Sequence, residues 1–207
     1  MTTIRVGVVA DTHCPEFLDR LPTRIGELLA GVDLILHAGD ISSLETLAEL
    51  GRIAPVEAVH GDHDRGLNLP SRRLVEVGGR KIGLVHGNRS RLIEEPATLT
   101  GTLTLGLWWP KAGLYRWLRE AFPDADAVVY GHTHFADVRR EQGAVLFNPG
   151  AVYQVTPDEA RRRLRRRPDW FEWSWLQVIR HRRATPVPSV GILEISPDGI
   201  AASVLTL

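Results

Sequence analysis

The sequence has little of several features that would narrow its class. Its single cysteine, Cys14, cannot form a disulfide within the chain, and its first residues, MTTIRVGVVADTH, lack the basic start and apolar run of a secretory signal peptide. No apolar run reaches the roughly 18 residues that a membrane-spanning helix requires. We therefore expect a cytoplasmic protein with no membrane span and no disulfide scaffold.

Net charge is also missing, because 25 lysine and arginine residues balance 25 aspartate and glutamate residues. A partner selected by bulk electrostatics would find little to bind, so any recognition by charge has to be local. The rest of the composition is ordinary for a globular protein, with 43% hydrophobic and 24% charged residues in a chain of 207. This length suits a single domain, residues 1–207, with a sizeable core.

Short apolar runs alternate with helical stretches along much of the chain. The predicted elements are, in order, a strand at 4–10, a helix at 22–30, a strand at 32–37, a helix at 43–50, a strand at 55–59, a hairpin of 73–77 and 81–85, strands at 127–130 and 145–147, and a hairpin of 190–195 and 201–207. The alternation predicts an α/β fold, and the hairpins predict mixed sheets.

Two stretches, at about 88–123 and 153–188, interrupt this pattern and are interpreted as additions to the core. They hold all the tryptophans, which are Trp108, Trp109, Trp117, Trp170, Trp173 and Trp175. Packing, within the chain or across a homo-oligomer contact, is the usual role of such aromatics, and a cap that narrows a substrate cleft is the alternative. The arginine run at 161–167 favours a solvated face or a subunit contact, with nucleic acid as the less favoured partner.

The chemistry of the sequence is concentrated where predicted strands end. The polar residues at these ends are Asp11, His13, Asp40, Asp62, His63, Asp64, His86, His132 and His134. Ligands gather at the carboxyl ends of strands in α/β sheets, so we expect the functional site there. Carboxylates and imidazoles without thiolates suit Mn²⁺, Fe²⁺ or Zn²⁺, and so many ligands suit two ions that share a carboxylate. Such a pair lowers the pKa of a bound water and hydrolyses phosphate esters through the resulting hydroxide.

The order of these motifs resembles the calcineurin-like metallophosphoesterases, and within them the small bacterial and archaeal phosphodiesterases. The motifs that carry the resemblance are Asp11-x-His13, Gly39-Asp40, Gly61-Asp62-His63-Asp64, His86-Gly87, Gly131-His132-x-His134 and Asn148-Pro149-Gly150. The resemblance implies a four-layer α/β/β/α sandwich of two mixed sheets, as in metallo-dependent phosphatases. It also implies a small phosphate ester, a diester rather than a monoester, as the substrate.

The resemblance further implies a role for each motif residue. Three ligands for a first metal, three for a second and one bridging carboxylate are, in that order, Asp11, His13 and His134, then Asp62, His86 and His132, then Asp40. His63 would contact the substrate phosphate and the leaving group, and Asp64 would orient it. Manganese is the metal we expect first, with iron, zinc or nickel as alternatives.

One residue departs from the family pattern. Asp62 stands where the family usually has asparagine, and an ionised carboxylate there removes the single positive charge that two divalent ions, a hydroxide, Asp11 and Asp40 would leave. A trivalent iron or a protonated Asp62 would restore that charge. Otherwise we expect tight binding of the second metal and slow turnover.

A phosphoesterase fold that serves as a scaffold is the competing interpretation. The retromer's phosphoesterase-like subunit resembles the same branch and also has Gly-Asp in the third motif. A catalytically weak or inactive chain would then bind partners through its tryptophan- and arginine-rich additions. His63 argues against this alternative, because a scaffold has no need of it.

Overall fold

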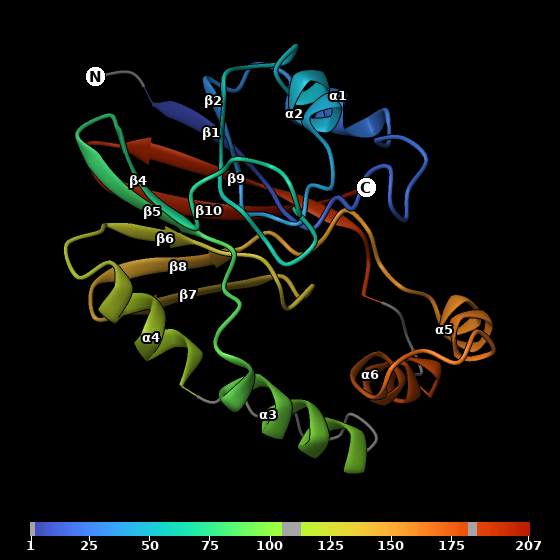
Figure 1. Ribbon diagram of the computed structural model, residues 1–207. Coiled ribbons are helices and arrows are strands. Elements are labelled where there is room, and N and C mark those ends of the chain that lie inside the picture. Colours follow the sequence, from blue (N-terminus) through green and yellow to red (C-terminus); the bar gives the residue numbers. More distant parts are fainter. Residues whose placement is uncertain (1–2, 105–112, 182–185) are drawn as a thin grey trace. The chain divides into compact units, whose positions relative to one another are not determined.

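The computed structural model describes residues 3–104, 113–181 and 186–207 (Figure 1). Contacts divide the chain into two compact units, of which the first comprises Met1–Gly87, Tyr115–Tyr153 and Val187–Leu207. The second comprises Asn88–Leu114 and Gln154–Pro186, and so derives from the two stretches interpreted as additions. A single domain with additions stays a prediction.

The first unit contains two five-stranded sheets. The first sheet has the order β10 (Gly199–Thr206), β9 (Ser189–Ser196), β1 (Ile4–Val9), β2 (Leu34–His37), β3 (Val56–Ala58). The second has the order β4 (Arg72–Val77), β5 (Arg80–Val85), β6 (Ala127–Val129), β8 (Ala144–Asn148), β7 (Asp137–Glu141). Strands β1, β2 and β3 are parallel, as are β5, β6 and β8, whereas the other pairings are antiparallel. The predicted α/β fold with mixed sheets is confirmed.

The alternation of side chains along β1 shows how the sheets pack. Val6 and Val8 belong to the core cluster that also contains Phe147 of the second sheet, so they point between the two sheets. Val9 points the other way and packs in a second cluster with Ile25. Each of these side chains is essentially buried, because a strand covered on both faces is apolar at consecutive positions.

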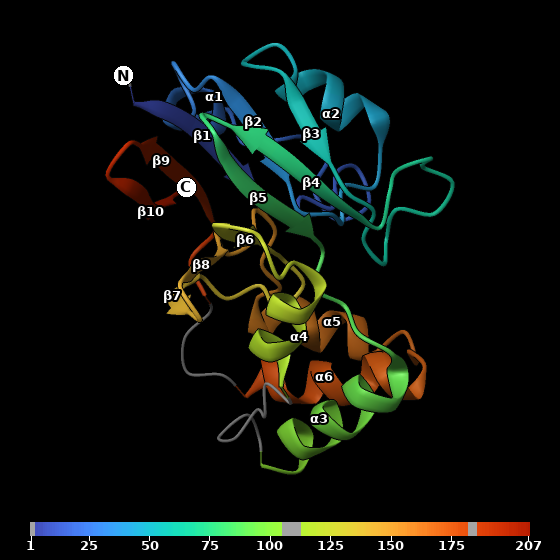
Figure 2. The same ribbon diagram turned by 90° about the vertical axis from the view of Figure 1, so that its left-hand side faces the viewer.

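Helices cover the outer faces of both sheets. On the first sheet lie α1 (Arg24–Leu28) and α2 (Leu44–Leu50) (Figure 2). The Ser43 side chain caps α2 by accepting the Thr46 N–H. On the second sheet, Phe122, directly after α4 (Leu114–Ala121), packs against β5 at Gly83, which has no Cβ to obstruct it. Helix, sheet, sheet and helix form the four predicted layers.

The second unit is helical in its described residues. Its helices are α3 (Arg91–Leu103), α5 (Pro157–Leu164) and α6 (Trp170–Arg180), and α6 contacts both others. Arg163 of α5 pairs with Glu172 of α6, with 2.9 Å between Nε and Oε1. The rings of Trp170 and Trp173 stack with centroids 5.4 Å apart.

The sequence also led to predictions about the tryptophans and about membrane-spanning helices. Trp108 and Trp109 lie outside the described residues, so their predicted packing is not addressed. Trp117 lies on α4, whose residues from Tyr115 onward belong to the first unit. Among the helices in the described parts of the chain, none has the length and apolar character needed to cross a bilayer.

Candidate metal centre

Loops that follow parallel strands carry most of the predicted ligands in an unusual backbone conformation. Five of these residues have positive φ angles: Asp11 (52°), His13 (47°), Asp40 (56°), His132 (65°) and His134 (58°). Residues other than glycine rarely adopt this conformation, which costs on the order of 1–3 kcal/mol at each position and persists where the surrounding structure enforces it. Because such strain clusters at functional sites, the backbone conformation alone indicates that this region is a functional site.

Two motif glycines have a steric reason to be glycine. A Cβ at Gly61 would collide with the backbone nitrogen and Oδ1 of Asp40. A Cβ at Gly131 would lie 2.8 Å from Oδ2 of Asp11. Both glycines therefore allow a neighbouring loop to approach the carboxylates closely.

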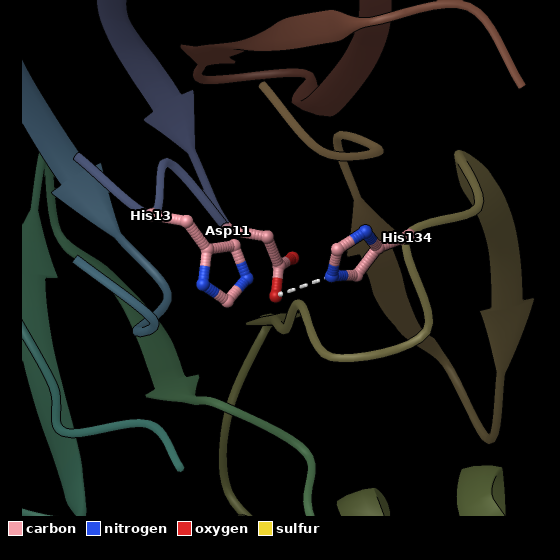
Figure 3. Close-up of side chains that lie close together, drawn as sticks. All are labelled: Asp11, His13 and His134. Carbon is pink, nitrogen blue, oxygen red and sulfur yellow. Dashed lines mark ion pairs between the residues drawn. The ribbon is translucent and has the colours of Figure 1, made fainter. Parts of the chain in front are cut away.

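The first predicted ligand group comes together in the structure. Asp11 and His13 follow β1 and His134 follows β6, and their donor atoms all lie within 4.8 Å of one another. His134 Nε2 is 3.5 Å from Asp11 Oδ1 (Figure 3). The backbone N–H of His132 donates to both Asp11 oxygens at 3.2 Å, which fixes the carboxylate.

The second predicted group also converges. Donor atoms of Asp62, His86 and His132 lie within 4.8 Å of one another, with 3.4 Å between His132 Nδ1 and Asp62 Oδ2. His86 Nδ1 donates to the Ala38 carbonyl at 2.8 Å. This hydrogen bond places the proton of a neutral His86 ring on Nδ1 and leaves the Nε2 lone pair for a ligand.

Asp40 joins the two groups. Its Oδ2 lies 3.5 Å from His13 Nε2 and 3.3 Å from His86 Nε2. Its Oδ1 accepts the backbone N–H of His63 at 2.8 Å. Asp11, Asp40 and His86 also have donor atoms within 4.8 Å of one another. All seven predicted ligands are thus neighbours, and their binding of metal stays a prediction.

The buried donor atoms fit a cation. His86 is fully buried, and its Nε2 has no hydrogen bond of good geometry among the described residues. This nitrogen lies 3.3 Å from Asp40 Oδ2, and a buried nitrogen without a well-aligned hydrogen bond is costly, unless the site is built for a ligand. A divalent ion among these oxygens and nitrogens would meet that requirement.

The electrostatics of the centre also call for positive charge. Burial raises the pKa of the Asp11 carboxyl well above its usual value. Burial also disfavours the charged form of His86, but Asp40 and Asp11 outweigh it and raise the His86 pKa to about 10. His86 lowers the pKa of Asp40 in return, despite the burial of Asp40. Without metal, the carboxylates therefore hold a proton on His86.

His13 and His37 are neutral by contrast. Burial lowers the pKa of His13 to about 3 and that of His37 to about 4. A neutral His13 suits metal ligation. His37, to which the sequence assigned no role, is a core histidine that accepts the Gly39 N–H at 3.2 Å and lies 3.2 Å from Thr12 Oγ1.

Asp64 differs from its expected role. Its carboxylate is fully buried and accepts four backbone N–H groups at 2.7–2.9 Å, from Asp40, Ile41, Ser42 and Gly61. It therefore fixes the loops after β2 and β3 to each other. The His63 ring contacts Glu16 instead, with 2.9 Å between Nδ1 and Oε2. The side chains of adjacent loop residues point in different directions. Asp64 therefore does not contact the His63 ring, although it is the next residue in the sequence.

Asn148 supports the loop that carries His132 and His134. Its Nδ2 donates to the Gly131 carbonyl at 2.8 Å and to Thr133 Oγ1 at 3.1 Å, and its Oδ1 accepts the Gly150 N–H at 2.9 Å. The sequence indicated Asn148 only as a family motif, without a role. Its position directly at the end of β8 is the signal that could have found it.

Replacing Asn148 by alanine should weaken metal binding by about 10–100-fold, the usual effect of losing a group that positions metal ligands. The loop would lose the hydrogen bonds that Asn148 Nδ2 donates to the Gly131 carbonyl and to Thr133 Oγ1. Calorimetric titration of metal-free protein measures the effect, with exposed Asn68→Ala as the matched control. Equal affinities for the two variants would contradict this role.

Comparisons with known proteins agree with this architecture. The model for the calcineurin-like phosphoesterase superfamily domain matches residues 4–163. A probable metallophosphoesterase of Methanothermobacter thermautotrophicus is 34% identical over 148 residues, which cover 70% of this chain and 76% of that protein.

Two solved structures have a similar fold over nearly the whole chain. Vacuolar Protein Sorting 29 from Cryptosporidium parvum has a TM-score of 0.64 and 23% identity, and the match covers 100% of both chains. Wild-type Vps29 from Entamoeba histolytica, solved in complex with Zn²⁺, has a TM-score of 0.62 and 20% identity, with 98% of this chain and 99% of that chain covered.

Proposed function

This chain belongs to the calcineurin-like phosphoesterase superfamily, and from that premise we propose that it is a dinuclear metal-dependent phosphodiesterase. Membership implies a phosphoester substrate and divalent metal ions. The observation that carries the proposal is the pair of three-residue donor groups joined by Asp40. One ion alone would not need this many donors.

The proposed ligands follow the two groups. Asp11, His13 and His134 would hold one ion, and a second ion would be held by Asp62, His86 and His132. Asp40 would contact both. Manganese is proposed first, and the Zn²⁺ complex of the Entamoeba protein supports a divalent ion in this fold.

Asp40 and His63 would then have separate roles in the reaction. When bound, the cations lower the pKa of water and neutralise phosphate oxygens. Asp40 is fixed through its second oxygen by the His63 N–H, which keeps its Oδ2 directed at His13 and His86. The His63 side chain is 38% exposed and can reach a substrate, where its proton would go to the leaving oxygen.

Asp62 favours a diester over a monoester. Burial alone would raise the pKa of its carboxyl, but the hydrogen bond with His132 and the charge of that ring lower it overall. Asp62 is therefore ionised at neutral pH, and the centre attracts anions weakly. A diester carries one negative charge, whereas a monoester carries nearly two, so the diester is disfavoured less.

Hydrolysis of bis(4-nitrophenyl) phosphate and of 4-nitrophenyl phosphate, with the metal content of the same sample, tests the proposal. We expect turnover that depends on Mn²⁺, with the diester preferred. Protein that binds two ions and hydrolyses neither ester would contradict it.

Exposed apolar side chains favour a scaffold as the second candidate function. In the second unit, Leu92 is 86% exposed, Leu103 75% and Trp170 66%. A contiguous patch of such side chains would be typical of a partner-binding surface. If the chain is a scaffold, neither the wild type nor any variant should show metal-dependent turnover.

Replacing Asp62 by asparagine should raise kcat on the diester by about tenfold. Removing one negative charge close to the phosphate is worth 1.4 kcal/mol or more at catalytic distances. Steady-state kinetics at saturating Mn²⁺ measures the change, with exposed Asp124→Asn as the control. A lower rate at full metal occupancy would show that the charge of Asp62 assists the reaction.

A further inference from the structure

Glu16 contacts the His63 ring, although no motif includes it. Both Glu16 oxygens lie within hydrogen-bond distance of His63 Nδ1, at 3.1 Å for Oε1 and 2.9 Å for Oε2. Ser42 Oγ donates to Oε2 at 3.1 Å. The Glu16 side chain is thus fixed from the loop after β2 while it contacts the ring on the loop after β3.

A second imidazole flanks the same carboxylate. His13 Nδ1 is 3.9 Å from Glu16 Oε2, and it is a buried nitrogen with no hydrogen-bond partner among the described residues. The other nitrogen of His13 faces Asp40. The His13 and His63 rings meet edge to face, with centroids 4.7 Å apart and planes at 82°. Glu16 therefore lies between the His13 ring, whose other nitrogen faces Asp40, and the half-exposed His63 ring.

We propose that Glu16 is the positioning residue for His63, an inference that rests on the proposed phosphodiesterase function. Accepting the Nδ1–H fixes the ring plane and leaves Nε2 directed away from Glu16. As the bond between phosphorus and the leaving oxygen breaks, the Nε2 proton moves to that oxygen, which leaves as an alcohol. The water consumed supplies hydroxide to phosphorus and a proton that restores His63.

This contact takes over the role expected of Asp64. Asp64 has both oxygens occupied by backbone N–H groups, whereas Glu16 has both oxygens near one imidazole nitrogen. The Glu16 side chain is 39% exposed. Its position is explained by His63 rather than by packing.

Kinetics on two diesters tests the role. For Glu16→Ala we expect kcat on an alkyl phosphodiester to fall about 10–100-fold with little change in KM, because only protonation of the leaving group is impaired. On bis(4-nitrophenyl) phosphate the fall should be much smaller, since nitrophenolate leaves without a proton. Glu16→Asp should recover part of the loss, and exposed Glu27→Ala is the matched control. Equal losses on both substrates, or no loss, would overturn the proposal.

A second measurement does not need activity. In metal-free protein, ¹⁵N NMR of the His63 ring should show the Nδ1 proton bound to a carboxylate, and Glu16→Ala should remove that signature. An unchanged spectrum overturns the contact, even when the wild type has no turnover and the proposed function fails. Glu16 could instead bind a metal ion together with His13 and His63, and metal titration tests this alternative. Loss of one bound ion in Glu16→Ala would make Glu16 a metal ligand and would overturn the positioning role.

Discussion

Replacing Asp40 by asparagine is expected to lower the rate of diester hydrolysis by about 10³-fold and to reduce the number of tightly bound ions, because losing a cation removes several kcal/mol of transition-state stabilisation. Asp40 is the residue whose Oδ2 faces both His13 and His86. An amide provides one neutral oxygen there, and its NH₂ group cannot bind a cation. The substitution nevertheless keeps the size of the side chain, so the effect reports on the shared charge.

Two measurements on the same sample test this prediction. Elemental analysis after dialysis gives the number of ions per chain, and steady-state kinetics gives kcat. Asp198→Asn, in the exposed turn between β9 and β10, serves as the control. Two bound ions with a rate within tenfold of wild type would show that Asp40 is not the bridge.

Replacing His63 by alanine is expected to lower the rate on an alkyl phosphodiester by about 10²–10⁴-fold, the usual contribution of a general acid, while both ions stay bound. The His63 side chain lies outside the seven predicted ligands and is held by Glu16. Its backbone N–H, which fixes Asp40, is retained in the variant. Loss of rate without loss of metal is therefore the expected pattern.

This pattern also separates an enzyme from a scaffold. The matched control is His181→Ala, an exposed histidine in the second unit. If wild type and His63→Ala hydrolyse the alkyl phosphodiester equally slowly, the scaffold is the better explanation. If His63→Ala loses an ion as well, His63 is a ligand and its proposed role changes.

The sequence predicted the features that follow from local chemistry. Polar residues after parallel strands converge because the ends of those strands meet, and this rule brought together ligands as distant as Asp11 and His134. The hairpins were predicted because Gly78-Gly79 and Asp198-Gly199 are turn sequences. The apolar run at 4–10 predicted the strand β1, and the structure packs side chains on both of its faces.

Strand β7 was missed because its sequence, DVRRE, has no apolar alternation. It is an edge strand and half-exposed, so charged side chains are tolerated there. The turn that pairs it with β8 contains Gln142 and Gly143, with φ angles of 48° and 84°. Glycine after a polar residue was the one local signal of the hairpin.

Contacts that support the site could not be predicted from local sequence. Glu16 meets His63 across 47 positions, and Asn148 meets Gly131 across 17. Such pairs depend on how loops from different strands approach one another. Asp64 is adjacent to His63 in sequence, but it accepts hydrogen bonds from backbone groups of the loops after β2 and β3, and its predicted role in orienting His63 stays a prediction.

The left-handed backbone at Asp11, His13, Asp40, His132 and His134 bears on how this chain tolerates sequence drift. Glycine, or asparagine in place of histidine, would adopt the same conformation more readily, so an exchange there should make the fold more robust. A lineage that kept the fold merely as a platform would gain from such exchanges and lose nothing. The acid and imidazole side chains at these positions therefore cost stability, which is expected where the chemistry of the side chains rather than the fold requires them.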